Sequence, residues 1–114
     1  MKTLIVGASK KPDRYSFMAA EKLKKYGHEI VQFSKKADID ILNSLDGVLG
    51  IDTVTMYINP SLQSQYFDDI LELKPRRVIF NPGTENPTFE KLLKDQNIMS
   101  IEGCTLVMLQ TGQY

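Results

Sequence analysis

The residues best suited to chemistry lie in one stretch near the start of the chain, between Gly7 and Ser16. Gly7 lets the backbone approach a ligand closely, and a helix starting near Ser16 would present free N–H groups and a partial positive charge. That charge is worth about 0.3–1 kcal/mol to an exposed phosphate. Because cations accompany it, we expect a phosphate-binding loop; the alternative is a solvated basic turn in which Ser16 only caps the helix. The candidate contacts are Gly7, Ala8, Ser9, Lys11, Arg14, Tyr15 and Ser16, with Lys10 adding charge.

A second candidate contact follows the apolar stretch 29–33, where the chain continues as Ser34, Lys35 and Lys36. An NAD site needs an acidic residue at this point and a Gly-x-Gly-x-x-Gly turn before it, and the sequence has neither. Two lysines instead suit a phosphorylated ribose, which favours coenzyme A or NADP over NAD. The alternative is a pair of solvated surface lysines.

Three further turns follow expected strands. Asn59 and Pro60 form the first, Asn81, Pro82 and Gly83 the second, and Cys104 belongs to the third. Their polar groups could contact a ligand, or they could be ordinary turns and helix caps, with Cys104 a small buried hydrophobe.

No catalytic set accompanies these candidates. The chain has one histidine, His28, which we expect at the opposite end of the sheet from these turns. We find no carboxylate pair, no nucleophile with a base and no metal-ligand spacing on the candidate turns. We therefore expect a non-enzymatic binder without a metal.

The elements that must position these turns alternate between strand and helix. Strands are expected at 3–6, 29–33, 52–58, 77–80 and 97–101, with helices at 16–26, from 59 to before 75, and from 86 onward. A short helix is expected within 38–45. Crossover connections between such strands make the sheet parallel. We predict an α/β, Rossmann-like three-layer sandwich with a five-stranded sheet of order 3-2-1-4-5, whose ligand lies at the carboxyl ends of the strands.

Length and composition limit the class of protein. The 114 residues fit one domain spanning 1–114, and the 14 basic and 14 acidic side chains cancel, which argues against nucleic-acid or membrane partners. The single cysteine excludes an internal disulfide. Without a signal peptide or membrane-length apolar run, we expect a cytoplasmic protein. The apolar end at 106–109 could form a homodimer surface.

Several segments together resemble a known family: the small bacterial CoA-binding proteins, stand-alone relatives of the CoA-binding domain of the succinyl-CoA synthetase α subunit. The resemblance is carried by 6–9, 12–16, 26–31, 52–57, 77–86 and 104–109. It implies a Rossmann-like fold and coenzyme A as the ligand. It further implies a pyrophosphate region at Gly7, Ala8, Ser9, Arg14 and Ser16, a 3′-phosphate near Lys36, and family matches at Asn81, Pro82, Gly83 and Cys104.

The sequence also departs from that family. Ser34 and Lys35 stand where many members have Asn-Pro, and the stretch 36–52 is short beside longer members. The synthetase's phosphorylated histidine belongs to a separate domain, so ligase activity is not implied. Three hypotheses result: non-catalytic binding of coenzyme A or acyl-CoA, an NADP-binding oxidoreductase module, and a structural or interaction protein that has lost the ligand.

Overall fold

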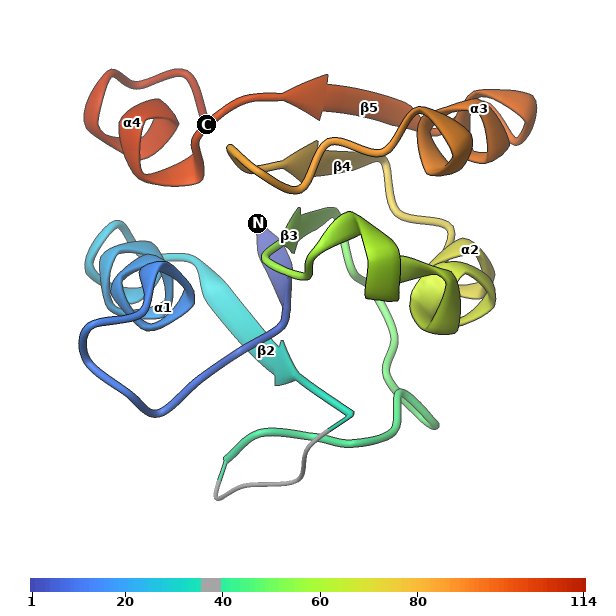
Figure 1. Cartoon of the computed structure of the whole chain (residues 1–114). Helices are drawn as coiled ribbons and strands as arrows, with labels where there is room; N and C mark the ends of the chain where they lie inside the picture. Colours follow the sequence, from blue (N-terminus) through green and yellow to red (C-terminus); the bar gives the residue numbers. More distant parts are fainter. Residues whose placement is uncertain (36–39) are drawn as a thin grey trace.

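The computed structural model describes residues 1–35 and 40–114. Its five strands form a single parallel sheet, with helices on both faces. Figure 1 shows α1 and α4 on one face and α2 and α3 on the other, which makes three layers. In chain order the elements are β1 (Lys2–Val6), α1 (Tyr15–Lys25), β2 (Glu29–Phe33), β3 (Thr53–Met56), the 3-10 helix η1 (Pro60–Tyr66), α2 (Phe67–Leu73), β4 (Arg77–Phe80), α3 (Pro87–Asp95), β5 (Met99–Glu102) and α4 (Thr105–Gln110).

The predicted fold class is confirmed, whereas the predicted strand order is wrong in one position. The order is β2-β1-β3-β4-β5, so β3 lies beside β1 and not outside β2. The outer side of β2 is taken by Leu42, which forms an isolated parallel bridge with Phe33. The Leu42 N–H donates to the Gln32 carbonyl at 2.8 Å, and its carbonyl accepts from the Ser34 N–H at 2.9 Å. The chain thus touches the outer edge of β2 only at its end, among the described residues, and the next full strand pairs with β1.

The helix expected within 38–45 is absent from the described part of that segment, 40–45, which contains turns, bends and this bridge. Residues 38 and 39 lie outside the described residues. A polar sequence follows the bridge at Asn43, Ser44 and Asp46, and such side chains bond their own backbone and favour turns over helix interiors.

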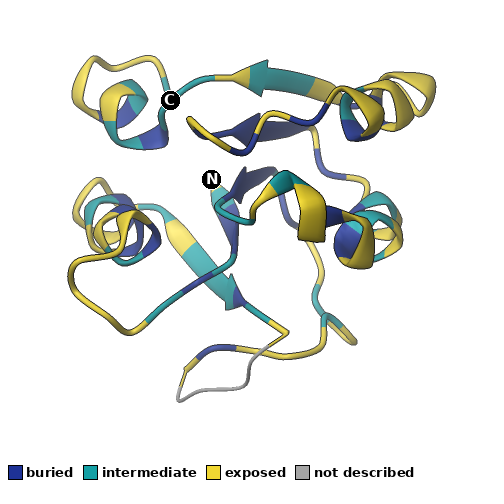
Figure 2. Ribbon diagram, viewed as in Figure 1, coloured by how far each residue is buried: buried dark blue, intermediate teal, exposed yellow. Residues whose placement is uncertain are grey.

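The core explains which strands lie in the middle of the sheet. All residues of β3 and β4, and all but the first of β1, are buried, while β2 and β5 are partly exposed at the edges (Figure 2). A short apolar run buried on both faces is typical of a central parallel strand. One core cluster packs α2 and α3 through Ile70, Phe89 and Leu93, and the other packs α1 and α4 through Leu23 and Leu109.

The amino end of the sheet is closed by the carboxyl terminus of the chain. The buried Arg77 donates to the Thr53 hydroxyl at 2.9 Å and to the Tyr114 carbonyl at 3.2 Å. Its guanidinium also lies 4.6 Å from the Tyr114 ring centroid. This packing leaves the carboxyl ends of the strands as the open edge. In the described part of the chain, no helix has the length and apolar character needed to span a membrane.

Candidate ligand-binding site

A cavity of about 670 Å³ lies at the carboxyl ends of the strands, where the predicted turns meet. Its volume falls in the range typical of small-molecule sites, roughly 300–1,000 Å³. Most predicted contacts line it: Gly7, Ala8, Ser9, Lys11, Arg14, Tyr15, Ser16, Asn59, Pro82 and Gly83. Lys10, which the sequence suggested only as added charge, and Thr84, considered for its hydroxyl, also line it, together with Ser34, Ile41 and Tyr57, which sequence reasoning did not assign to the site. We call it the main cavity.

The loop between β1 and α1 depends on Gly7. Its φ is +90°, a region that L side chains rarely adopt. A Cβ at this position would lie 3.0 Å from both the Tyr57 carbonyl oxygen and the Ile58 Cδ1 atom. The Gly7 N–H also donates to the Phe33 carbonyl at 2.9 Å. Only glycine lets the loop turn this closely over the ends of β2 and β3.

The amino end of α1 is left open toward this cavity. The helix begins at Tyr15 after Arg14, and within the described residues no side chain caps it and its first turn carries no acidic group. Ser16 is buried inside the first turn, so it is not the cap that the solvated-turn alternative required. By contrast, Asn86 caps α3 by accepting from the Phe89 N–H at 3.1 Å. The free N–H groups of α1 therefore remain able to bind an anion.

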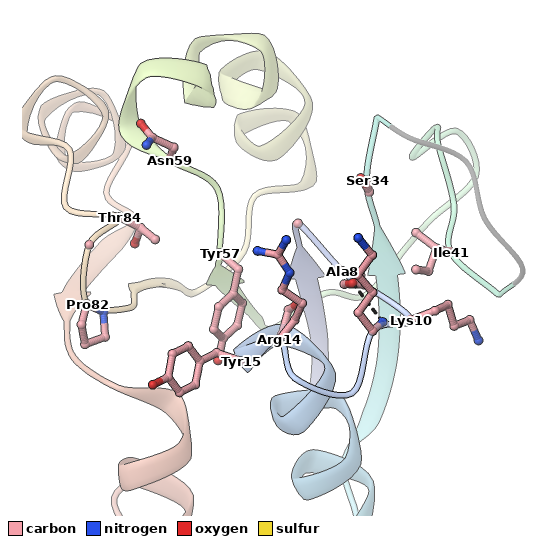
Figure 3. Close-up of a pocket in the computed structure, with 15 residues that line it drawn as sticks. Ala8, Lys10, Arg14, Tyr15, Ser34, Ile41, Tyr57, Asn59, Pro82 and Thr84 are labelled. Carbon is pink, nitrogen blue, oxygen red and sulfur yellow. Dashed lines mark hydrogen bonds between the residues drawn. The ribbon is translucent and has the colours of Figure 1, made fainter.

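Two cations beside this helix end are unpaired in the described part of the chain. Lys11 and Arg14 are exposed, and neither side chain has an ion pair or hydrogen bond there. Lys10 lies 3.4 Å from Asp40, an exposed pair of small energetic value. In Figure 3, Arg14 extends between Tyr57 and Ala8, while Lys10 points outward. Charge available to a ligand thus concentrates at Arg14 and Lys11.

Lys35, the first of the two lysines after β2, does not line the main cavity. The Lys35 ammonium pairs with Asp69 at 3.1 Å and lies 5.4 Å from the Tyr66 ring centroid. It lines a separate cavity of about 300 Å³ together with the segment 43–48. Lys36 lies outside the described residues. The structure therefore does not bring Lys35 into the main cavity, and its contact with a ribose phosphate stays a prediction.

The turn after β3 contributes an exposed helix cap. The Asn59 side-chain oxygen accepts from the Ser61 N–H at 2.9 Å and from the Ser61 hydroxyl at 2.8 Å. Pro60 is the first residue of η1, as the Asn-Pro signal predicted, and it lines neither the main cavity nor its neighbours. Asn59 is thus the residue of this turn that faces the cavity.

The turn after β4 has its polar groups bound inside the protein. The buried Asn81 side chain donates to the Thr55 hydroxyl at 2.7 Å and to the Met56 carbonyl at 2.9 Å. Its oxygen accepts from the Thr105 N–H at 2.8 Å. Asn81 therefore joins β3, β4 and the start of α4. Pro82 and Gly83, on the same turn, line the main cavity.

A smaller cavity of about 230 Å³ adjoins the main one, and we call it the side cavity. Its walls come from Tyr15, Tyr57, Asn81, Pro82, Cys104 and Leu106. Tyr15, Tyr57 and Pro82 line both cavities. Cys104, a predicted contact, is partly buried and directly precedes α4. Sequence reasoning did not assign α4, and the only signal for it was the apolar run 106–109.

Tyr57 forms the wall between the two cavities. Its hydroxyl is buried and has no hydrogen-bond partner in the described part of the molecule. Burial raises the pKa of Tyr57 to about 12. The nearby Thr55 and Thr105 hydroxyls bond one another at 2.8 Å. Tyr57 is therefore a neutral, mainly apolar surface at physiological pH.

Few of the described residues at the main cavity are suited to acid–base catalysis or metal binding. Among the described residues no Asp or Glu lines the main cavity, and no group of three or more His, Cys, Asp and Glu is placed to hold a metal. His28 lies near the amino terminus, with its Nδ1 atom 3.1 Å from the Met1 nitrogen. Burial lowers the pKa of His28. The arrangement suits binding of an anion more than bond cleavage.

Comparison with known proteins identifies the family and the fold of the chain. The family described as "CoA binding domain" matches residues 1–110. A crystal structure of an uncharacterized protein is 47% identical, covers 99% of this chain and 97% of its own, and has a TM-score of 0.95. No curated protein matches the chain significantly.

More distant structures share the fold. A hypothetical protein from Pyrococcus horikoshii OT3 is 22% identical over 96% of this chain and 81% of its own, with a TM-score of 0.86. Cell-free ID.343 from Thermus thermophilus is 20% identical over 99% of this chain and 90% of its own, with a TM-score of 0.84.

Proposed function

Because the chain belongs to the CoA-binding domain family, we propose that it binds coenzyme A or an acyl-CoA without catalysing a reaction. The observation that carries this proposal is the open amino end of α1 at the main cavity, beside Arg14, whose side chain has no partner among residues 1–35 and 40–114. A diphosphate is the part of coenzyme A that such a site recognises, through backbone N–H groups and charge-assisted hydrogen bonds. We further propose that residues 1–114 act as one domain in the cytoplasm.

The positions of the strand ends suggest how the ligand would lie. The diphosphate would lie against the backbone of residues 7–9 and the first turn of α1, next to Arg14. The adenosine would extend toward the end of β2, where Ser34 and Ile41 line the cavity. The other arm of the ligand would then cross Tyr57 and approach Pro82. This orientation leaves Lys36 as the candidate for the 3′-phosphate.

Thermal unfolding with added nucleotides tests the proposal. A ligand at 100 times its dissociation constant should stabilise the folded state by about 2.7 kcal/mol. Coenzyme A should raise the melting temperature, and dephospho-CoA should raise it less if a lysine holds the 3′-phosphate. A response to NADP alone would contradict the proposal and support an oxidoreductase module. No response to any of the three would support an interaction protein that has lost its ligand.

A further inference from the structure

The side cavity lies at the end of the site where the proposed ligand carries its sulfur. Strand ends cross the site in the order β2, β1, β3, β4 and β5, with Ser34 following β2 and Cys104 following β5. The side cavity is built from the segments after β3, β4 and β5, together with Tyr15 at the start of α1. If the adenosine lies toward β2, the opposite arm of the ligand points to this cavity.

The walls of the side cavity are chemically selective. They consist of two aromatic rings, a proline, a leucine and a thiol, together with Asn81. The Asn81 amide already makes its three hydrogen bonds within the protein. No charged side chain lines the cavity among the described residues. Among the described residues the Tyr57 hydroxyl is the one buried side-chain group at these walls without a partner, and its single hydrogen bond would not offset the desolvation of a carboxylate or ammonium, whereas a neutral alkyl group would be favoured.

We propose that the side cavity holds a short, uncharged acyl group on the sulfur of the ligand, so that the protein prefers short neutral acyl thioesters to free coenzyme A. This inference rests on the proposed function. The volume of about 230 Å³ sets an upper limit on chain length, and the shared wall of Tyr15, Tyr57 and Pro82 makes the two cavities continuous. Discrimination against acyl groups that end in a second carboxylate follows from the same lining.

Titration calorimetry of the full chain with five ligands tests the preference. The probes are coenzyme A and its acetyl, butyryl, dodecanoyl and succinyl thioesters. Each methylene that the cavity buries should tighten binding roughly fourfold, so butyryl-CoA should bind more tightly than acetyl-CoA and coenzyme A. Succinyl-CoA, with the same number of acyl carbons as butyryl-CoA, should gain nothing, and dodecanoyl-CoA, whose acyl chain is too large for about 230 Å³, should bind less tightly than butyryl-CoA.

Two substitutions at Leu106 locate the effect. Leu106→Phe should fill the cavity and abolish the butyryl preference while the affinity for coenzyme A stays within about twofold. Leu106→Ala should enlarge the cavity and improve binding of dodecanoyl-CoA relative to butyryl-CoA. Val107→Phe is the matched control, because Val107 is exposed on the same helix and does not line the cavity. Circular dichroism checks that each variant folds.

The outcomes separate the two proposals. Equal affinities for coenzyme A, butyryl-CoA and succinyl-CoA in the unsubstituted protein would overturn the acyl inference and leave the proposed function intact. An unchanged ratio of butyryl-CoA to coenzyme A affinity in both Leu106 variants would also overturn it. Failure of every probe, coenzyme A included, would overturn the proposed function itself.

Discussion

Two loops at the same edge of the sheet use their polar groups in opposite ways. Both contain a glycine with a φ of +90°, Gly7 after β1 and Gly83 after β4. In the first loop, Lys11 and Arg14 have no side-chain partner among the described residues. In the second, Asn81 makes three internal hydrogen bonds, and the Thr84 hydroxyl donates to the Asn81 carbonyl at 2.7 Å.

The two loops therefore have different roles at one cavity. The first is suited to bind a ligand, and the second stabilises the fold. A polar group that has no partner within the protein is free to bind a ligand. Removing it should therefore lower the affinity for the ligand and leave the fold intact. A buried polar group with complete internal bonding contributes to stability, because removing it strands its partners. Substitutions in the first loop should therefore change ligand affinity, and substitutions in the second should change the free energy of unfolding.

Asn81→Ala should produce the largest loss of stability. It would leave the Thr105 N–H and the Met56 carbonyl without the Asn81 side chain, and the Thr55 hydroxyl would keep only its bond to the Thr105 hydroxyl. At about 1–3 kcal/mol for each unsatisfied group, we expect about 3 kcal/mol or more from urea unfolding. Asn59→Ala is the control, because the side chain of this exposed cap bonds only Ser61 among the described residues. Its loss should lower the free energy of unfolding by about 1 kcal/mol. Equal losses in both variants would remove the scaffold role of the second loop.

Gly7→Ala and Gly83→Ala compare the two glycines directly. Both carry the same unfavourable φ, which costs an L residue about 1–2 kcal/mol. An added Cβ at Gly7 would also meet the Tyr57 carbonyl oxygen at 3.0 Å, while at Gly83 nothing lies within 4 Å. Gly7→Ala should therefore lower the free energy of unfolding by about 1–3 kcal/mol more than Gly83→Ala. Equal effects in denaturant unfolding would show that the first loop does not depend on this close approach.

Arg14→Ala should weaken binding of coenzyme A roughly ten- to a hundredfold, the value of a charge-assisted hydrogen bond. Its free energy of unfolding should change by no more than about 0.5 kcal/mol, as for an ordinary surface substitution. Lys25→Ala removes an exposed cation from the other end of the same helix and should keep its affinity. Calorimetric titration would count against the site if Arg14→Ala and the control bound equally well.

Tyr57→Phe should have the smallest effect at neutral pH, because its hydroxyl has no partner to lose in the described structure. The folded pKa of about 12 exceeds the ordinary value of 10, so the unfolded chain ionises first as the pH rises. The stability from this group is complete below pH 10 and is lost between pH 10 and 12. At pH 11 the parent protein should have lost about 1 kcal/mol more than the variant. A constant difference in urea unfolding from pH 8 to 11 would contradict the raised pKa.

The first loop could be predicted from sequence because its signals are local. A buried β-branched run, one glycine and nearby cations are all within 16 residues, and the structure places most of them around the main cavity. The fold class was predictable for a similar reason, since strand and helix patterns alternate along the chain. These features need no knowledge of contacts between distant residues.

The remaining features depend on such distant contacts. The strand order depends on the pairing of β3 with β1, between residues about 50 positions apart, which no periodicity marks. The short α4 is held by Leu109 in the core and by the bond from its Thr105 N–H to Asn81. Lys35 pairs with Asp69, 34 positions away, so its distance from the main cavity was not visible in the sequence.

Titration of ¹⁵N-labelled protein with coenzyme A, followed by amide chemical shifts, most directly tests whether the ligand binds at the start of α1. We expect the largest chemical-shift changes at the amides of residues 8–17, where the open end of α1 and the glycine turn would hold the diphosphate. Changes confined to the separate cavity at residues 43–48 beside Lys35, with residues 8–17 unaffected, would contradict it.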